Sequence, residues 1–65
     1  MKVIELIHLK TKDNIKSIET KDFHSNIYFH LNKGDYINLN DITYEIVKKV
    51  LIEEQTLIIV INDIQ

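Results

Sequence analysis

The chain has 65 residues, a net charge of −2 and no cysteine, which excludes disulfides and thiolate metal sites and argues against a strongly basic nucleic-acid-binding domain. Isoleucine occurs 13 times, whereas alanine, proline, arginine and tryptophan are absent, a composition typical of strands rather than helices. We therefore expect one small β domain over residues 1–65, cytoplasmic because no signal peptide or membrane span is evident.

The N-terminal third predicts one clear strand and one ambiguous segment. Residues 2–9 are apolar on both faces, which is typical of a central strand covered on both sides. Residues 11–14 have the composition of a turn. In residues 15–20, Ile15 and Ile18 are three positions apart, so this segment could be a short irregular strand or a long loop.

The middle of the chain predicts a three-strand meander. Residues 23–31 alternate between apolar and polar side chains, as a half-buried strand does. A three-residue loop, 32–34, would place Phe29 opposite Ile37 and put Gly34 where a positive φ is needed. A two-residue turn, 40–41, would then pair Leu39 with Ile42 and Ile37 with Tyr44, with Ile42, Tyr44 and Ile46 facing the core.

The C-terminal third predicts one long strand, a polar turn at residues 53–55 and a final strand at 56–61. Lys48 interrupts the inner apolar row, so either a bulge re-aims the chain near Val47 or the aliphatic stem of Lys48 lines the barrel mouth. The last strand is apolar on both faces, like the first. We expect these two strands to meet, because closure removes exposed edges.

No pattern in the chain points to catalysis, a metal or a cofactor. His24 and His30 fall six residues apart on one expected strand, roughly 20 Å at about 3.3 Å per residue, which is too far to share an ion. Nucleophile elbows, phosphate loops and zincin signatures are absent from the sequence. We therefore expect a protein that is not an enzyme and binds neither metal nor cofactor.

Two surface patches follow from the expected register. Tyr28, His30, Tyr36 and Asn38 would share one outer face, which could stack bases, anchor a protein partner or merely stabilise the sheet. A second patch is apolar and would consist of Val47, Leu51, Ile58 and Val60. Self-association would bury it, unless a bulge turns these residues inward.

Residues 34–61, GDYINLNDITYEIVKKVLIEEQTLIIVI, resemble the second half of SH3-like small barrels found in phages and mobile elements of low-GC bacteria. The resemblance implies an all-β fold, a five- to six-stranded antiparallel SH3-like barrel or a strongly bent meander sheet. We expect a non-catalytic protein-binding module, a phage or mobile-element regulator or inhibitor of a host protein, acting as a homo-oligomer. The alternative is a single-stranded nucleic-acid or nucleotide binder that uses the Tyr28, Tyr36 and His30 face.

Overall fold

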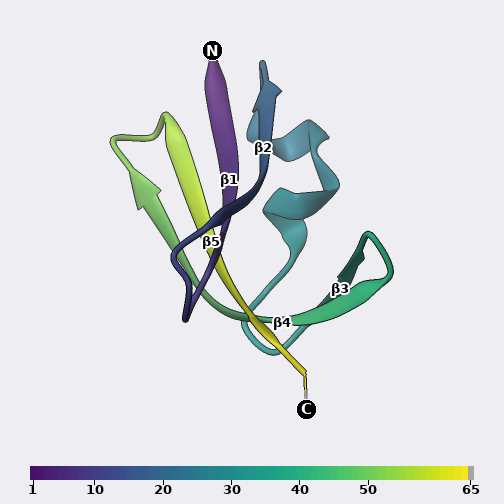
Figure 1. The fold of residues 1–65 in the computed structure, drawn as a ribbon. Coiled ribbons are helices and arrows are strands. Elements are labelled where there is room, and N and C mark those ends of the chain that lie inside the picture. Colours follow the sequence, from purple (N-terminus) through teal and green to yellow (C-terminus); the bar gives the residue numbers. More distant parts are fainter. Residues whose placement is uncertain (65) are drawn as a thin grey trace.

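The computed structural model describes residues 1–64. One five-stranded sheet curls strongly into a half-barrel, and two short 3-10 helices lie across its open side (Figure 1). The elements in chain order are β1 (Lys2–His8), β2 (Asn14–Thr20), η1 (Phe23–Ser25), η2 (Ile27–His30), β3 (Tyr36–Leu39), β4 (Ile42–Ile52) and β5 (Thr56–Asp63). No helix within residues 1–64 is both long enough and apolar enough to cross a membrane.

The strand order across the sheet is β2-β1-β5-β4-β3. The expected meeting of the first and last strands is confirmed, but β1 and β5 run parallel and not antiparallel. The other neighbours are antiparallel, as expected. Five strands that alternate in direction leave the first and the last pointing the same way, so closure of this chain onto itself requires one parallel pair.

The β3–β4 hairpin has the predicted turn and the predicted register. Asn40 and Asp41 have φ values of 53° and 66°, the left-handed conformation that Asn and Asp tolerate better than most residues. Gly34, just before the hairpin, has a φ of 94°. The register pairs Leu39 with Ile42 and Ile37 with Tyr44.

Residues 23–31 do not form the predicted strand. They form η1 and η2, and Phe29 therefore has no cross-strand partner in the sheet. Each helix begins at a capping side chain: Asp22 Oδ1 accepts the His24 N–H at 3.0 Å, and Asn26 Oδ1 accepts the Tyr28 N–H at 2.9 Å. Such side-chain caps offer the backbone a local alternative to a strand ladder, which overrides the alternating pattern.

The ambiguous segment 15–20 belongs to β2, and its three-residue apolar spacing has a structural cause. The β1–β2 pairing shifts, so that Leu6 pairs with Lys16 and Ile7 with Asn14. This shift leaves Ile15 as an extra residue in the strand, which reverses the alternation locally. Ile15 and Ile18 consequently both pack against the core.

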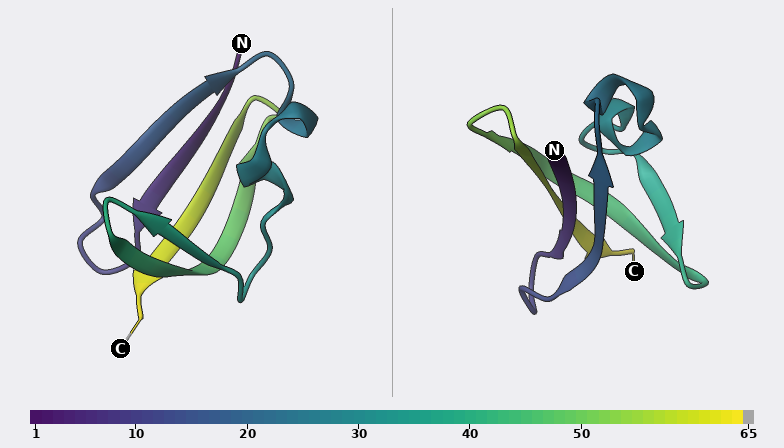
Figure 2. Two further views of the ribbon diagram at one scale, coloured as in Figure 1. Left: turned by 90° about the vertical axis from the view of Figure 1, so that its right-hand side faces the viewer. Right: turned by 90° about the horizontal axis from the view of Figure 1, so that it is seen from above.

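Of the two alternatives considered for Val47 and Lys48, the structure has the bulge. The pairing of β4 with β5 shifts between Ile46 and Lys48, and β4 bends sharply there (Figures 1 and 2). Its first part pairs with both β3 and β5, whereas the part after the bulge has only β5 as a strand neighbour. The bulge therefore divides β4 into a central half and an edge half.

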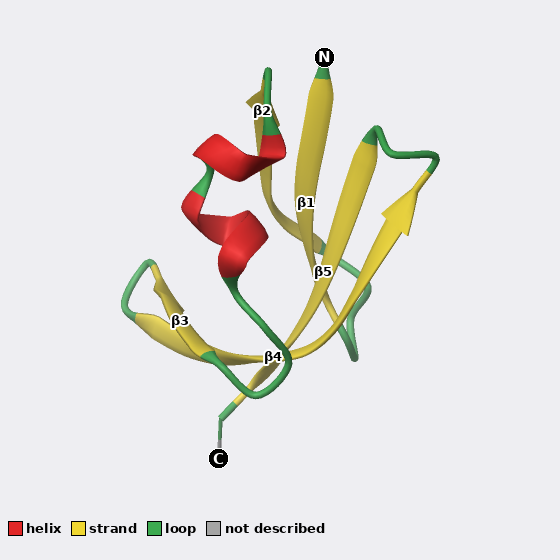
Figure 3. Cartoon of the chain, turned by 180° about the vertical axis from the view of Figure 1, so that it is seen from behind, coloured by secondary structure: helices red, strands yellow, loops and turns green. Residues whose placement is uncertain are grey.

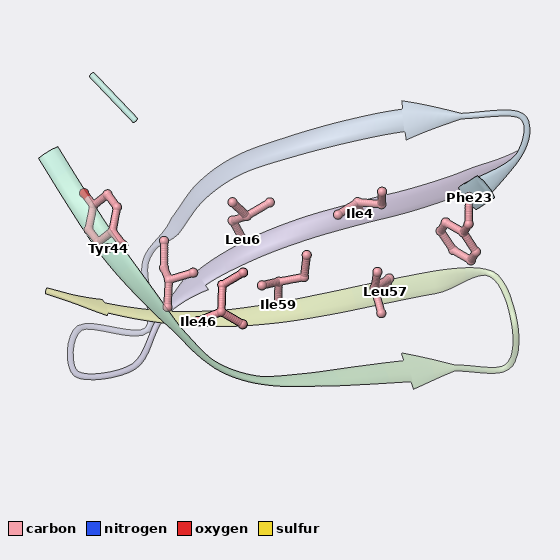
Figure 4. Close-up of a cluster of buried hydrophobic side chains, with 8 residues drawn as sticks. Ile4, Leu6, Phe23, Tyr44, Ile46, Leu57 and Ile59 are labelled. Atoms are coloured by element: carbon pink, nitrogen blue, oxygen red, sulfur yellow. The ribbon is translucent and has the colours of Figure 1, made fainter. Parts of the chain in front are cut away.

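The core fills the concave side of the sheet. Its buried cluster consists of Ile4, Leu6, Phe23, Tyr44, Ile46, Leu57, Ile59 and Ile61 (Figure 4). Alternate residues of β1, β4 and β5 supply seven of these side chains, and η1 supplies Phe23. Ile42 was predicted to join them but is 49% exposed, because it lies at the tip of the β3–β4 hairpin, beyond the end of the core.

Candidate functional site

The predicted aromatic face on the sheet does not exist. Tyr28 and His30 lie on η2, away from any strand. Tyr36 and Asn38 do share the exposed side of β3, but Tyr36 pairs with Glu45 and is 64% exposed. Asn38 Nδ2 donates to a threonine hydroxyl of the neighbouring strand at 3.1 Å. The four residues therefore do not share one face of the sheet.

A different aromatic cluster is present, formed by Phe23, His24, Phe29 and His30. The two phenylalanine rings stack with centroids 5.3 Å apart and planes within 2°. The imidazoles of His24 and His30 approach Phe29 edge-on, at centroid distances of 5.0 and 5.5 Å. Stacked and T-shaped pairs of this kind each contribute about 0.5–1.5 kcal/mol beyond area burial, so this cluster fixes the two 3-10 helices against one another.

The expected separation of His24 and His30 is wrong. Their ring centroids are 6.4 Å apart, because two 3-10 turns span the distance that an extended strand would have stretched to roughly 20 Å. His30 Nε2 lies 2.9 Å from the backbone oxygen of His24. Within residues 1–64, no three His, Cys, Asp or Glu side chains are grouped in a way that could hold a metal ion.

Two lysines attach the aromatic cluster to the sheet. Lys2 Nζ lies 5.1 Å from the Phe23 centroid and donates to the backbone oxygen of Glu54 at 2.6 Å. Lys49 Nζ lies 5.2 Å from the Phe29 centroid and donates to the Phe29 backbone oxygen at 2.6 Å. Each ammonium therefore combines a cation–π contact with a hydrogen bond. The bond of Lys49 joins β4 to η2, whereas the bond of Lys2 joins β1 to the adjacent β4–β5 turn.

A shallow groove of about 220 Å³ lies between this cluster and the end of β4. It is lined by Lys2, Asp22, Phe23, His24, Phe29, Leu51 and Glu54. The volume is below the ~300–1,000 Å³ typical of small-molecule sites. The groove was not predicted, because the alternating pattern assigned both phenylalanines to a strand. The Asp22 and Asn26 caps, four residues apart, are the sequence signal that could have indicated it.

The convex side of the sheet is also largely apolar. Paired residues in a ladder project to the same side, so Leu57, Ile59 and Ile61 face the core, and the residues between them face outward. We define the convex face as the aliphatic residues on that outer side: Val3, Ile7, Val50, Ile52, Ile58 and Val60. Val50 and Ile52 are 42% and 44% exposed, whereas Val60 is 9% exposed.

The predicted apolar patch of Val47, Leu51, Ile58 and Val60 is divided between two sides. Ile58 and Val60 lie on the convex face, as expected. Leu51 pairs with Leu57 and therefore lies on the concave side, where it lines the groove. Val47 lies at the bulge and is half-buried. The bulge reverses the alternation of inward and outward side chains between Val47 and Leu51, so the prediction from a regular two-residue repeat is wrong there.

Comparisons with models of protein families, with curated proteins and with solved structures found no match for this chain. The described residues offer an apolar convex face, a small mixed groove and a stretch of β4 that is paired on one edge only.

Proposed function

We propose that this chain is a non-catalytic protein-binding module that acts as a homo-oligomer. The observation that carries the proposal is the convex face, six aliphatic side chains on the outer side of the sheet. No strand or helix of residues 1–64 lies over it (Figure 2). Two charged residues lie beside it on the same side of the sheet, Glu5 of β1 opposite Ile58 and Lys48 of β4 opposite Val60.

An uncovered apolar sheet face favours a protein partner over other ligands. Contiguous apolar patches on small monomers usually mark interaction surfaces, and the fully buried centres of interfaces are depleted of charged residues. A chain of 65 residues buries only about 60% of its unfolded surface by itself. Burial of the convex face against another protein would therefore add to a core that is small.

The sequence supports a more specific fold family, origin and role for this module. The pattern of residues 34–61 supports an SH3-like barrel. The Ile-rich, Arg-free composition supports an origin in a phage or mobile element of a low-GC bacterium. We propose on this basis that the module regulates or inhibits a host protein in the cytoplasm.

The nucleic-acid alternative has less support. It needed Tyr28, Tyr36 and His30 on one stacking platform, and these residues lie on separate elements. The net charge of −2 also disfavours binding driven by phosphate contacts.

The test compares substitutions on the convex face with a matched substitution elsewhere. Ile58→Thr and Ile58→Glu lie at the centre of the face, whereas the control Ile42→Glu places the same charge at an exposed isoleucine of the hairpin tip. We expect proteins captured from host lysate by the wild-type chain to be retained by the control and lost with both Ile58 variants. Circular dichroism verifies that each variant is folded.

Two results would count against the proposal. One is capture that is identical for the wild-type chain and both Ile58 variants. The other is tight binding of a fluorescent oligo-dT that weakens steeply between 50 and 200 mM salt, as phosphate-driven binding does. The second result would support the nucleic-acid alternative instead.

A further inference from the structure

We propose that two copies of the chain pair through the edge half of β4, antiparallel and around a two-fold axis at Leu51, so that their sheets join into one. This inference deepens the homo-oligomer part of the proposed function and rests on it. It names a surface distinct from the convex face, namely the backbone edge of residues 48–52, which we call the open edge.

The open edge has no strand beside it within residues 1–64. The pairing of β3 with β4 ends at Glu45. The next residue, Ile46, exchanges backbone hydrogen bonds of 2.9 Å with Gly34 and Asp35, and no strand follows on that side. Figure 3 shows this part of β4 at the margin of the molecule. The 3-10 helices contact it from the concave side, where Lys49 Nζ donates to the Phe29 backbone oxygen.

The backbone of the open edge is oriented for pairing. The Ile52 carbonyl accepts the Gln55 N–H at 3.0 Å, inside the β4–β5 turn. Backbone groups of successive strand residues point to opposite edges. The N–H and C=O groups of Leu51 and Lys49 therefore point away from β5, toward solvent. A strand paired along this edge would satisfy these groups, since each is an obligatory hydrogen-bonding group.

The three free strand edges of the sheet differ in their protection. The β2 edge is mostly polar or charged, and β3 is only four residues long. The open edge instead carries three successive apolar residues, Val50, Leu51 and Ile52, which are 42%, 50% and 44% exposed. Natural sheets protect such edges with charged side chains, lysine above all. Lys48 and Lys49 protect only the first part of the open edge, and the ammonium of Lys49 is held by the Phe29 backbone oxygen, so the apolar second part is the part available for pairing.

The open edge and the turn that follows it are together complementary to themselves. Residues 48–54 read KKVLIEE, and the two glutamates belong to the β4–β5 turn, not to the strand. With antiparallel pairing around Leu51, Val50 lies opposite the partner's Ile52, and Lys48 lies level with the partner's turn and its two exposed glutamates. Apolar cross-strand pairs at the centre and opposite charges at each end favour this pairing.

Other arrangements of the same two edges lose this complementarity. Moving the axis one residue toward the N-terminus places Lys48 opposite the partner's Ile52. Moving it one residue toward the C-terminus places Val50 opposite the partner's Glu54. A parallel arrangement sets lysine against lysine. The favoured register is isologous, so it closes as a dimer and does not propagate into a fibre.

The backbone conformation of the β4–β5 turn does not explain why two glutamates occupy it. Glu53 and Glu54 have φ values of 51° and 59°, a conformation that favours Gly, Asn and Asp in two-residue hairpin turns. The β3–β4 turn uses Asn40 and Asp41 in that conformation. Negative charge near the lysines of a partner strand explains why the β4–β5 turn has glutamates instead. A second copy of the chain supplies those lysines at the matching position, whereas an unrelated strand need not.

A charge-swap experiment tests the register, with dimer Kd measured by light scattering after size exclusion at several protein concentrations. We expect a dimer for the wild-type chain. Lys48→Glu or Glu54→Lys alone places like charges opposite each other twice per dimer, and we expect Kd to rise about tenfold or more. An equimolar mixture of these two variants, and the double variant Lys48→Glu/Glu54→Lys, should restore dimerisation because opposite charges again face each other.

A second pair of variants tests the axis. Leu51→Arg and Ile42→Arg change two β4 residues of almost equal exposure, 50% and 49%, and only Leu51→Arg should abolish the dimer. Because the chain has no cysteine, Leu51→Cys should form a disulfide-linked dimer on oxidation, and Ile42→Cys should not. The Cα separation of opposite strand residues, about 5.5 Å, permits this bond.

The outcomes separate this inference from the proposed function. A monomeric wild-type chain at millimolar concentration, or failure of the charge-swapped mixture to associate, overturns the edge dimer. A dimer that survives Leu51→Arg but is lost with Ile58→Glu also overturns it and assigns self-association to the convex face. Loss of partner capture with Ile58→Glu while the dimer persists leaves both proposals standing.

Discussion

His8 is the one polar or charged residue that is buried within residues 1–64. It is 7% exposed and lies at the end of β1, where its ring edge meets Tyr44 at a centroid distance of 6.1 Å. Its Nδ1 accepts the backbone N–H groups of Lys10 and Thr11 at 3.1 and 3.3 Å. The ring proton is therefore on Nε2, which lies 3.3 Å from Asp63 Oδ1. One imidazole thus organises the turn after β1 and contacts the end of β5.

We expect His8→Phe to lower the free energy of unfolding by about 2 kcal/mol. Phenylalanine keeps a ring of similar shape but provides no acceptor for the two backbone N–H groups. The control Asp63→Asn removes only the charge of the exposed partner, and we expect a change of less than about 1 kcal/mol. Urea denaturation measures both. An unfolding midpoint for His8→Phe equal to that of the wild-type chain would contradict this role.

Residue chemistry predicted the β3–β4 turn because its requirements are local. Asn40 and Asp41 have the positive φ values that their residue types favour. Gly34 also has the expected positive φ, but the hairpin loop predicted at residues 32–34 is wrong, because the residues before it form no strand. The distance between His24 and His30 could not be predicted in the same way. It depends on the conformation of the five residues between them, and the choice between strand and 3-10 helix changed it from roughly 20 Å to 6.4 Å.

At the scale of elements, the prediction failed where capping competed with periodicity. Residues 23–31 alternate as a strand does, but Asp22 and Asn26 cap two successive turns, and the stacking of Phe23 on Phe29 holds those turns together. An alternating pattern of nine residues is compatible with two short 3-10 helices, since each buries only one or two side chains. The capping residues were the more informative signal.

The β4–β5 turn should be more stable with residues suited to its backbone. Glu53→Asn/Glu54→Gly would place the preferred pair at two positive-φ positions, and we expect it to raise the monomer's free energy of unfolding by about 1 kcal/mol. The same change removes both anions of the turn beside the open edge, so we expect the dimer Kd to rise. Urea denaturation at low concentration and light scattering measure the two effects. An unchanged free energy of unfolding would show that the turn is not strained. An unchanged dimer Kd would show that the turn is not part of the interface.

At the scale of the whole molecule, the sequence predicted the all-β class and the meeting of the first and last strands, but not the side on which each C-terminal residue lies. The bulge between Ile46 and Lys48 shifts the period, so Leu51 moves to the concave side while Ile58 and Val60 remain convex. A bulge position is decided by the tertiary pairing. The sequence thus showed that the C-terminal strands carry more apolar residues than one core face needs. The structure was required to show that these residues are divided between a convex face and an open edge.

The dimer proposed at the open edge has a consequence for the whole molecule's stability. Partners that bind only the folded state stabilise it by mass action, so the apparent Tm of the wild-type chain should rise with protein concentration above the dimer Kd. Each tenfold increase adds about 1.4 kcal/mol per mole of dimer, and that energy, divided between two chains of this size, corresponds to a shift of a few degrees. Calorimetry over a hundredfold range of concentration measures it. In Leu51→Arg the Tm should become independent of concentration, whereas in Ile42→Arg it should keep the wild-type dependence. A concentration-independent Tm in the wild-type chain would mean that the small core alone stabilises the fold.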